Sequence, residues 1–265
     1  MAGYRKFVAV CILAALGSLP QGTAGAAELI ILTNQGATPG VAALAAAFER
    51  MTGHKVTVIQ DSGLAGGLAV TDPRAPALER RLDSGPADLV TGNPEQIDGL
   101  VKEGKVVVGT AAPFAIAGLG LSVRLGLPKP DISTVEAYKA TLLAAKSIGY
   151  SRGCSGTHAA EGIAKLGIAA QLKSKTVLAD NGPVVEYLAK GDFDLGIQQT
   201  NIMVGTPGTE YVGPLPDFLN DPCSSSVALL TVSKEPEAAR AMIRFMVSPE
   251  AAPLLRKTYV EPAHR

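Results

Sequence analysis

Short apolar runs alternate with helical segments along this 265-residue chain, and this alternation limits the fold more than any other feature. Residues 28–32 (ELIIL) are typical of a buried strand. Pro39 opens an alanine-rich segment that ends at Gly53, as in a helix. Residues 56–59 predict a second strand. A strand–helix–strand unit favours parallel pairing with a right-handed crossover, so the chain opens as an α/β protein.

A second series of the same kind follows a Pro- and Gly-rich stretch at residues 126–131, which suits a linker. A capping box predicts a helix over residues 134–145. Strands are expected at 147–150, 176–179 and 194–198, with helices between them. The sequence therefore predicts two α/β lobes, each with a mostly parallel sheet flanked by helices.

The first 26 residues have the composition of a secretory signal peptide. Arg5 and Lys6 precede an apolar run at 7–16, and small residues at 24–26 suit a cleavage site. The run is too short to span a bilayer, although a retained membrane anchor is the alternative. We expect export to the periplasm.

Removal of this leader leaves two cysteines, Cys154 and Cys223. In an oxidising compartment such a pair forms one disulfide or remains as two free thiols, and the sequence leaves both possibilities open. A disulfide would close a loop of about 70 residues and add roughly 4 kcal/mol to stability by the chain-entropy argument.

Composition and motifs exclude several classes of function. The 24 basic and 24 acidic residues balance and form no long basic block, which argues against a nucleic-acid partner. Tryptophan is absent, so a sugar site built on stacked indoles is excluded. The three histidines show no metal-ligand spacing, and the phosphate loop, the HExxH motif and the GxSxG elbow are missing. We expect no metal, no cofactor and no catalytic residue.

One segment leaves an enzymatic alternative open. Ser155 and Cys154 lie in a glycine-flanked turn, and His158 follows within about one helical turn. The alternative function is therefore a secreted serine or cysteine hydrolase. A triad base normally comes from a distant segment, however, which favours a protein without catalysis.

Small and hydroxyl-bearing residues fill two turns that lead from a strand into a helix, at 33–38 and 151–157. Helix N-termini present unpaired N–H groups and a partial positive charge, so they bind anions without a charged side chain. In open α/β sheets such turns lie where ligands bind, although ordinary capping is the alternative for either turn alone. The predicted anion contacts are Asn34, Gly36, Ser62, Gly63, Ser155, Gly156, Thr157 and Gln199.

Two further stretches contribute to this prediction. Asp61–Gly63 follows a predicted strand, and Gln198–Asn201 is a run of neutral hydrogen-bonding groups placed to close the site from the second lobe. Gln198, Arg152 and His158 are additional candidates, the last two because they supply positive charge. The alternatives are a polar strand-to-loop transition for the glutamines and a solvated surface charge for Arg152.

Four segments in a fixed order carry a likeness to a known family. They are residues 44–56 (LAAAFERMTGHKV), 85–90 (GPADLV), 194–199 (DLGIQQ) and 245–252 (FMVSPEAA). Together they resemble the molybdate-binding-type extracytoplasmic solute-binding proteins of ABC importers, and they span most of the mature chain. The resemblance implies a two-lobe periplasmic-binding fold in which the chain crosses twice between the lobes.

The implied division places residues 27–123 and 224–265 in lobe I and residues 124–223 in lobe II. An apolar run at 115–123, expected as a strand, ends the first part of lobe I.

Three positions depart from the family's pattern, and each departure removes a donor for a compact oxyanion. Gly36 stands where the family presents a serine, residues 61–64 (DSGL) replace a GSSG loop, and Gln199 replaces a frequent tyrosine. An uncompensated loss costs roughly 1.5–3 kcal/mol for each charged hydrogen bond. The ligand is therefore a molybdate-like oxyanion or, as these departures favour, a small organic carboxylate.

Sequence and resemblance together predict a monomeric, non-catalytic protein. It captures a small anion between its lobes, closes by hinge bending and delivers the anion to an ABC transporter permease. A sensor that presents the anion to a receptor is a further alternative.

Overall fold

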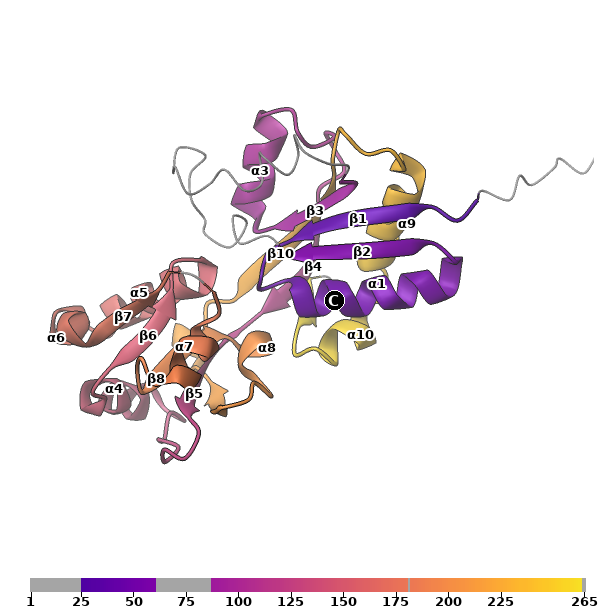
Figure 1. Ribbon diagram of the computed structural model, residues 1–265. Coiled ribbons are helices and arrows are strands. Elements are labelled where there is room, and N and C mark those ends of the chain that lie inside the picture. The colour runs from indigo at the N-terminus through magenta and orange to yellow at the C-terminus, as the bar shows by residue number, and fades with distance from the viewer. Residues whose placement is uncertain (1–24, 61–86, 181, 264–265) are drawn as a thin grey trace, which may run out of the picture.

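The computed structural model describes residues 25–60, 87–180 and 182–263, which form two α/β lobes (Figure 1). The expected leader over residues 1–26 lies almost entirely outside the described residues. Within the described ranges, no helix combines the length and the apolar character needed to cross a bilayer. The two lobes confirm the predicted fold class.

The first lobe is built on a six-stranded sheet in the order β11-β4-β10-β3-β1-β2. Its strands are β1 (Glu28–Thr33), β2 (Lys55–Gln60), β3 (Leu89–Gly92), β4 (Ala112–Ala117), β10 (Cys223–Leu229) and β11 (Glu261–Pro262). Its helices are α1 (Thr38–Thr52), α3 (Pro94–Lys102), α9 (Pro236–Met246) and α10 (Ala252–Arg256). The lobe thus combines the N-terminal strand–helix–strand unit with the returning C-terminal end of the chain.

The second lobe is built on a five-stranded sheet in the order β7-β6-β8-β5-β9. Its strands are β5 (Leu119–Arg124), β6 (Ile148–Ser151), β7 (Thr176–Ala179), β8 (Leu195–Gln199) and β9 (Thr209–Pro214). Its α-helices are α4 (Val135–Ala144), α5 (Cys154–Lys165), α6 (Ala169–Leu172), α7 (Val184–Lys190) and α8 (Thr200–Met203). Two 3₁₀ turns complete it, η2 (Lys173–Lys175) and η3 (Asp217–Leu219).

Each sheet is mixed, whereas the sequence suggested mostly parallel sheets. β1 pairs in parallel with β2 and β3, and β6 pairs in parallel with β7 and β8, as the crossover helices require. The strands at the crossings pair antiparallel: β10 with β3 and β4 in the first sheet, and β5 with β8 and β9 in the second. The chain enters the second lobe through β5 and returns to the first lobe through β10, and each of these strands runs opposite to its neighbours.

The chain first changes lobe at Gly118, between β4 and β5. The apolar run at 115–123, expected as one strand, is therefore two strands in different sheets. The first lobe boundary lies at Gly118 and not after residue 123. A Cβ on Gly118 would lie 3.1 Å from Oδ1 of Asn220, and this oxygen accepts a hydrogen bond from the Leu119 N–H at 2.6 Å. The two crossing segments thus contact each other directly.

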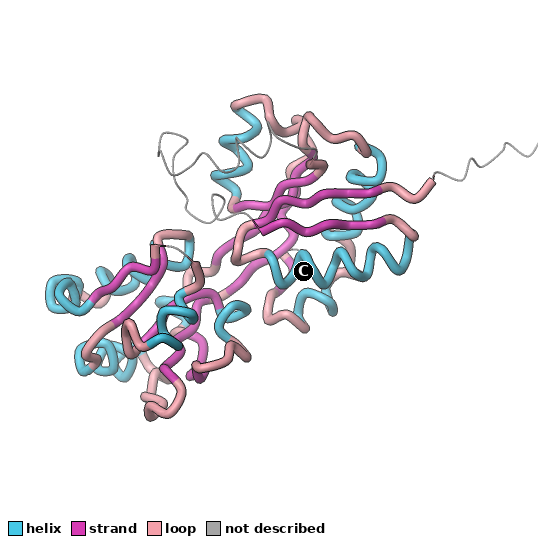
Figure 2. Tube along the Cα trace, in the orientation of Figure 1, coloured by secondary structure: helices cyan, strands magenta, loops and turns pink. Residues whose placement is uncertain are grey.

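Helices cover both faces of each sheet (Figure 2). In the first lobe, Phe48 of α1, Met242 of α9 and Leu255 of α10 belong to one buried cluster. Ile97 and Leu100 of α3 belong to a second cluster, which includes Leu32 and Val90. A fully buried side chain of this size contributes about 1.5–3 kcal/mol. The apolar stripes of the helices therefore hold the sheet between them.

The second lobe repeats this arrangement. Tyr138 of α4 and Ile163 of α5 are buried in one cluster, and Val184 and Leu188 of α7 are buried in another. Burial of Tyr138 also raises the pKa of its hydroxyl far above the ordinary value.

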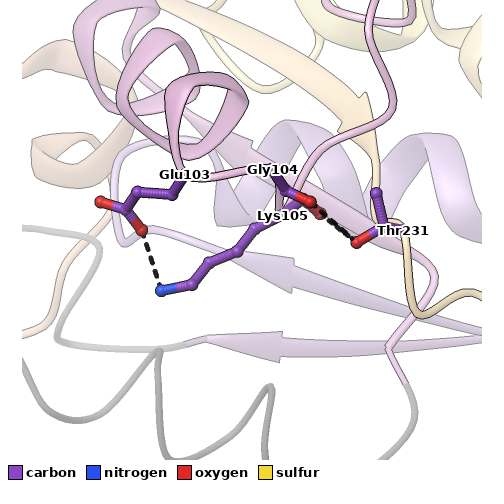
Figure 3. A network of polar contacts seen from close by, with 4 residues as sticks. All are labelled: Glu103, Gly104, Lys105 and Thr231. Carbon is purple, nitrogen blue, oxygen red and sulfur yellow. Dashed lines mark hydrogen bonds and ion pairs between the residues drawn. The ribbon is translucent and has the colours of Figure 1, made fainter.

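The segment that follows β10 is hydrogen-bonded to the loop after α3 (Figure 3). The Thr231 hydroxyl donates to the carbonyl oxygens of Gly104 and Lys105 at 3.2 and 3.1 Å. The Lys105 ammonium pairs with the Glu103 carboxylate at 2.8 Å. β10 is thereby anchored in the first lobe at the end opposite its crossing.

The Asp88 carboxylate, directly before β3, links three parts of the first lobe. It is 2% exposed. Oδ2 accepts from the Ile30 N–H at 2.9 Å, and Oδ1 accepts from the Ser233 hydroxyl at 2.7 Å and the Lys234 N–H at 3.1 Å. Asp88 therefore has a structural role that joins β1, β3 and the segment leading into α9.

We expect Asp88→Ala to lower the free energy of unfolding by about 3 kcal/mol, because it leaves several buried donors without an acceptor. Asp88→Asn, which keeps the shape and one acceptor, should cost less. The exposed Asp98 on α3 supplies the matched control, since Asp98→Ala should change stability by less than about 0.5 kcal/mol. Urea unfolding of the oxidised proteins measures all three, and equal midpoints for both alanine variants would contradict this role.

Candidate binding site

A small cavity lies between the two lobes, at the ends of strands from both sheets. Its volume is about 40 Å³, enough for roughly three water molecules. The first lobe contributes Asn34, Gln35, Gly36, Asn93, Gln96, Cys223, Ser224 and Ser225. The second lobe contributes Ser151, Gly153, Cys154, Ser155, Gln198 and Gln199. None of these described lining residues carries a charged side chain.

The start of α5 forms the wall on the side of the second lobe. Its N-cap is Gly153, so no side chain caps its first N–H groups. Ser155 is 5% exposed and lines the cavity. Gly156 is buried, and a Cβ on it would lie 1.6 Å from the Ser151 carbonyl oxygen. Glycine at 156 therefore lets α5 begin directly against the end of β6, with its N-terminus at the cavity.

The turn before α1 forms the wall on the side of the first lobe. The Asn34 carbonyl accepts from the N–H groups of Ala37 and Thr38 at 3.2 and 3.1 Å. The Asn34 side chain accepts from the Ala37 N–H as well, at 2.9 Å. The N–H groups that begin α1 are thus satisfied within the turn, whereas those that begin α5 have no side-chain cap.

Gln198 and Gln199, both buried at the end of β8, have different roles. Oε1 of Gln198 accepts from the Val184 N–H at the start of α7, and Nε2 donates across the cleft to Oε1 of Gln35, both at 3.0 Å. Among the described residues, none hydrogen-bonds to the side chain of Gln199. That side chain lies so close to Gly36 that a Cβ there would be 2.1 Å from its Oε1. Gln198 therefore joins the lobes, and Gln199 presents its amide at the cavity.

Three further predicted contacts, Thr157, Arg152 and His158, are not among the residues that line the cavity. Thr157 is exposed and does not line the cavity. Arg152 pairs with the Asp180 carboxylate, and its side chain is half exposed. Ser62 and Gly63 lie outside the described residues.

Cys154 and Cys223 form a disulfide, which settles the question that the sequence left open. Cys154 therefore has no free thiol to act as a nucleophile. Nδ1 of His158 lies 2.8 Å from the Asp221 carbonyl oxygen and no hydrogen bond links it to Ser155, so the two do not form a nucleophile–base pair. The geometry gives the hydrolase alternative no support.

Sequence reasoning missed six polar residues of the lining: Gln35 and Ser151 within the two predicted turns, and Asn93, Gln96, Ser224 and Ser225 outside them. Asn93 and Gln96 form a capping box at the start of α3. Ser224 and Ser225 follow the disulfide at the start of β10. Asn93 and Gln96 carried a usable signal, because an Asn-Pro step closely follows the apolar residues Leu89 and Val90. Ser224 and Ser225 carried none, because no helix follows them.

Two lobes joined by two crossings, with a cavity between them, define the periplasmic-binding-protein fold. Residues 29–260 match the family described as bacterial extracellular solute-binding protein, and the chain belongs to this family.

Two relatives and one solved structure illustrate the similarity. The chain is 30% identical over 235 residues to the aconitate isomerase of a Pseudomonas species, covering 88% of this chain and 87% of that protein. It is 28% identical over 244 residues to the molybdate-binding protein ModA of Azotobacter vinelandii, covering 88% of this chain and 89% of that protein. The structure of a periplasmic molybdate-binding protein of the same organism superposes with a TM-score of 0.69 at 18% identity, covering 88% of this chain and 98% of that one.

We expect Gly156→Ala to lower the free energy of unfolding by about 1–3 kcal/mol, because the added methyl group meets the Ser151 carbonyl. Gly162 on the same helix supplies the control, since the nearest atom to a Cβ there is 3.8 Å away. Gly162→Ala should leave stability unchanged or raise it by about 0.5–1 kcal/mol. Thermal unfolding compares the two variants, and equal destabilisation by both would refute the close contact.

Proposed function

We propose that this chain is a non-catalytic, extracytoplasmic solute-binding protein. It binds a small organic carboxylate between its lobes and delivers it to an ABC transporter permease. The observation that supports this function is the interlobe cavity, lined on one side by the uncapped start of α5 and around it by neutral donors.

An anion fits this lining without a counter-charged side chain. The first N–H groups of α5 carry the positive end of the helix dipole. The hydroxyls of Ser155, Ser224 and Ser225 and the amide of Gln199 line the same cavity and can donate to the ligand. Charge-assisted hydrogen bonds of this kind are stronger than neutral ones.

Two observations favour a carboxylate over a tetrahedral oxyanion. The planar amide of Gln199 fills the space beside Gly36, where a larger residue would collide with it. The relative at 30% identity is named for aconitate, an organic acid with three carboxylates. A cavity of about 40 Å³ takes roughly one carboxylate group. A larger acid therefore requires the lobes to lie further apart than they do here.

The lining also favours binding without catalysis, although that relative is named an isomerase. Moving a double bond next to a carboxylate requires a group that removes a proton and returns it. The described lining residues are amides, serines, glycines and two disulfide-bonded cysteines, none of which titrates near neutral pH.

A periplasmic location agrees with the Cys154–Cys223 disulfide, because such bonds persist in oxidising compartments. It also agrees with the basic and apolar leader that precedes residue 27.

Titration calorimetry of the oxidised protein with molybdate, sulfate, acetate, citrate and trans-aconitate tests this function. We expect at least one carboxylate to bind and molybdate to bind more weakly. Tighter binding of molybdate than of every carboxylate would overturn the ligand class.

Proton NMR of trans-aconitate incubated with the protein tests the absence of catalysis. Isomerisation of its double bond would overturn the proposal that the protein is non-catalytic.

Two substitutions in the cavity should weaken binding of the carboxylate that this screen identifies. Ser155→Ala and Gln199→Ala each remove a donor to a charged group, so we expect roughly 10- to 100-fold weaker binding. Thr157→Ala, on the exposed side of the same helix, should leave the affinity within about twofold, since it removes no lining donor. An equal loss in Ser155→Ala and Thr157→Ala would place the ligand elsewhere.

A further inference from the structure

The Cys154–Cys223 disulfide joins the lobes beside the cavity. Cys154 is the first residue of α5 in the second lobe. Cys223 is the first residue of β10 and pairs with Ala117 of β4 in the first lobe's sheet. Both cysteines line the cavity, and Cys223 is 2% exposed.

Three residues at the return to the first lobe, Asn220, Asp221 and Cys223, are bonded to the second lobe. The Asn220 side chain accepts from the Leu119 N–H, and the Asp221 carbonyl contacts Nδ1 of His158 at 2.8 Å. The disulfide is the third tie and the only covalent one among them. Together these ties fasten the segment that leads into β10 to the second lobe.

The same bond fixes two parts of the cavity lining relative to each other. Gly153 and Ser155 flank Cys154 at the uncapped start of α5. Ser224 and Ser225 follow Cys223 on β10. The disulfide therefore sets the spacing between helix N–H groups from one lobe and hydroxyl groups from the other.

We propose that the Cys154–Cys223 disulfide is a redox-sensitive tie that sets the affinity of the interlobe site. This inference rests on the proposed function. In the oxidised protein the tie preorganises the donors, and its reduction by a dithiol releases the crossing segment and weakens binding.

The reduction step balances as an ordinary thiol–disulfide exchange. A thiolate of the dithiol attacks one cysteine sulfur and forms a mixed disulfide, which its second thiol then resolves. Two electrons and two protons pass to the protein. The products are the free thiols of Cys154 and Cys223 and the disulfide form of the reductant.

Ligand and disulfide protect each other, because both cysteines line the cavity that the ligand fills. A dithiol that approaches through the cleft meets the bound ligand first. If oxidation favours ligand binding, ligand binding must equally disfavour reduction at equilibrium.

The first experiment needs no ligand. Hydrogen exchange is followed by mass spectrometry in the oxidised protein and in a Cys154→Ser/Cys223→Ser variant. We expect faster exchange in residues 150–158 and 219–226 of the variant and unchanged exchange in β1 and β2. His158→Gln, which removes the neighbouring tie to Asp221 and keeps the disulfide, should show a smaller change.

The second experiment measures affinity for trans-aconitate and citrate by calorimetry. We expect roughly tenfold weaker binding after reduction by dithiothreitol and in the double serine variant. Reoxidation of the reduced wild-type protein should restore the affinity. An irreversible loss of structure would not be reversed in this way. Saturating ligand should slow reduction, followed by thiol labelling.

The outcomes separate the two proposals. If the oxidised protein binds neither acid, the proposed carboxylate function fails, while the exchange data still report on the tie. If the oxidised protein binds but reduction changes neither affinity nor exchange, this inference is wrong and the proposed function stands. Changed exchange with unchanged affinity also overturns it, because the disulfide then stabilises the crossing without affecting the site.

Discussion

The hydrogen bond from the Leu119 N–H to the Asn220 side chain, at 2.6 Å, holds the two crossings between the lobes together. It joins the two crossings, each of which is a single strand of chain. Two crossings held side by side allow the lobes to bend about one shared axis, whereas separate crossings would allow independent motions. Because Gly118 carries no Cβ, the Asn220 amide can lie against it. This contact outside the cavity therefore acts together with the disulfide and the cross-lobe hydrogen bonds that border it.

Local patterns predicted the strand–helix units and their turns, because the apolar periodicity and the cap residues of those units lie within a few positions of each other. The split of residues 115–123 at Gly118 was not predictable in this way, since both halves are apolar and only long-range pairing assigns them to different sheets. Asn34 was a similar case. The sequence marks the start of α1, but it does not tell whether a ligand or the turn's own carbonyl satisfies the helix N–H groups.

A neutral lining has consequences for how tightly and how selectively a transport protein holds an anion. A buried cation would have to be desolvated, and without its ligand it would remain unpaired at large cost. Amides and hydroxyls cost less than a cation to desolvate and to leave unpaired. Their hydrogen bonds act only at short range and in fixed directions. Selectivity then depends on matching each donor to an acceptor, since an anion of the wrong shape leaves donors unpaired. Such a site can discriminate strongly and still release its ligand.

Direct hydrogen bonds between the lobes also affect how tightly a ligand is held. Gln198 donates to Gln35, and the Asn201 amide donates to the Gly36 carbonyl at 2.8 Å. Both bonds form between protein groups alone, so they stabilise the observed arrangement of the lobes whether or not a ligand is bound. A ligand shifts the equilibrium only by the difference between its affinities for the closed and the open form. In a protein that opens and closes around its solute, bonds that favour the closed form leave more of the ligand's binding energy to appear as affinity. We therefore expect the cross-lobe amides to favour tight binding.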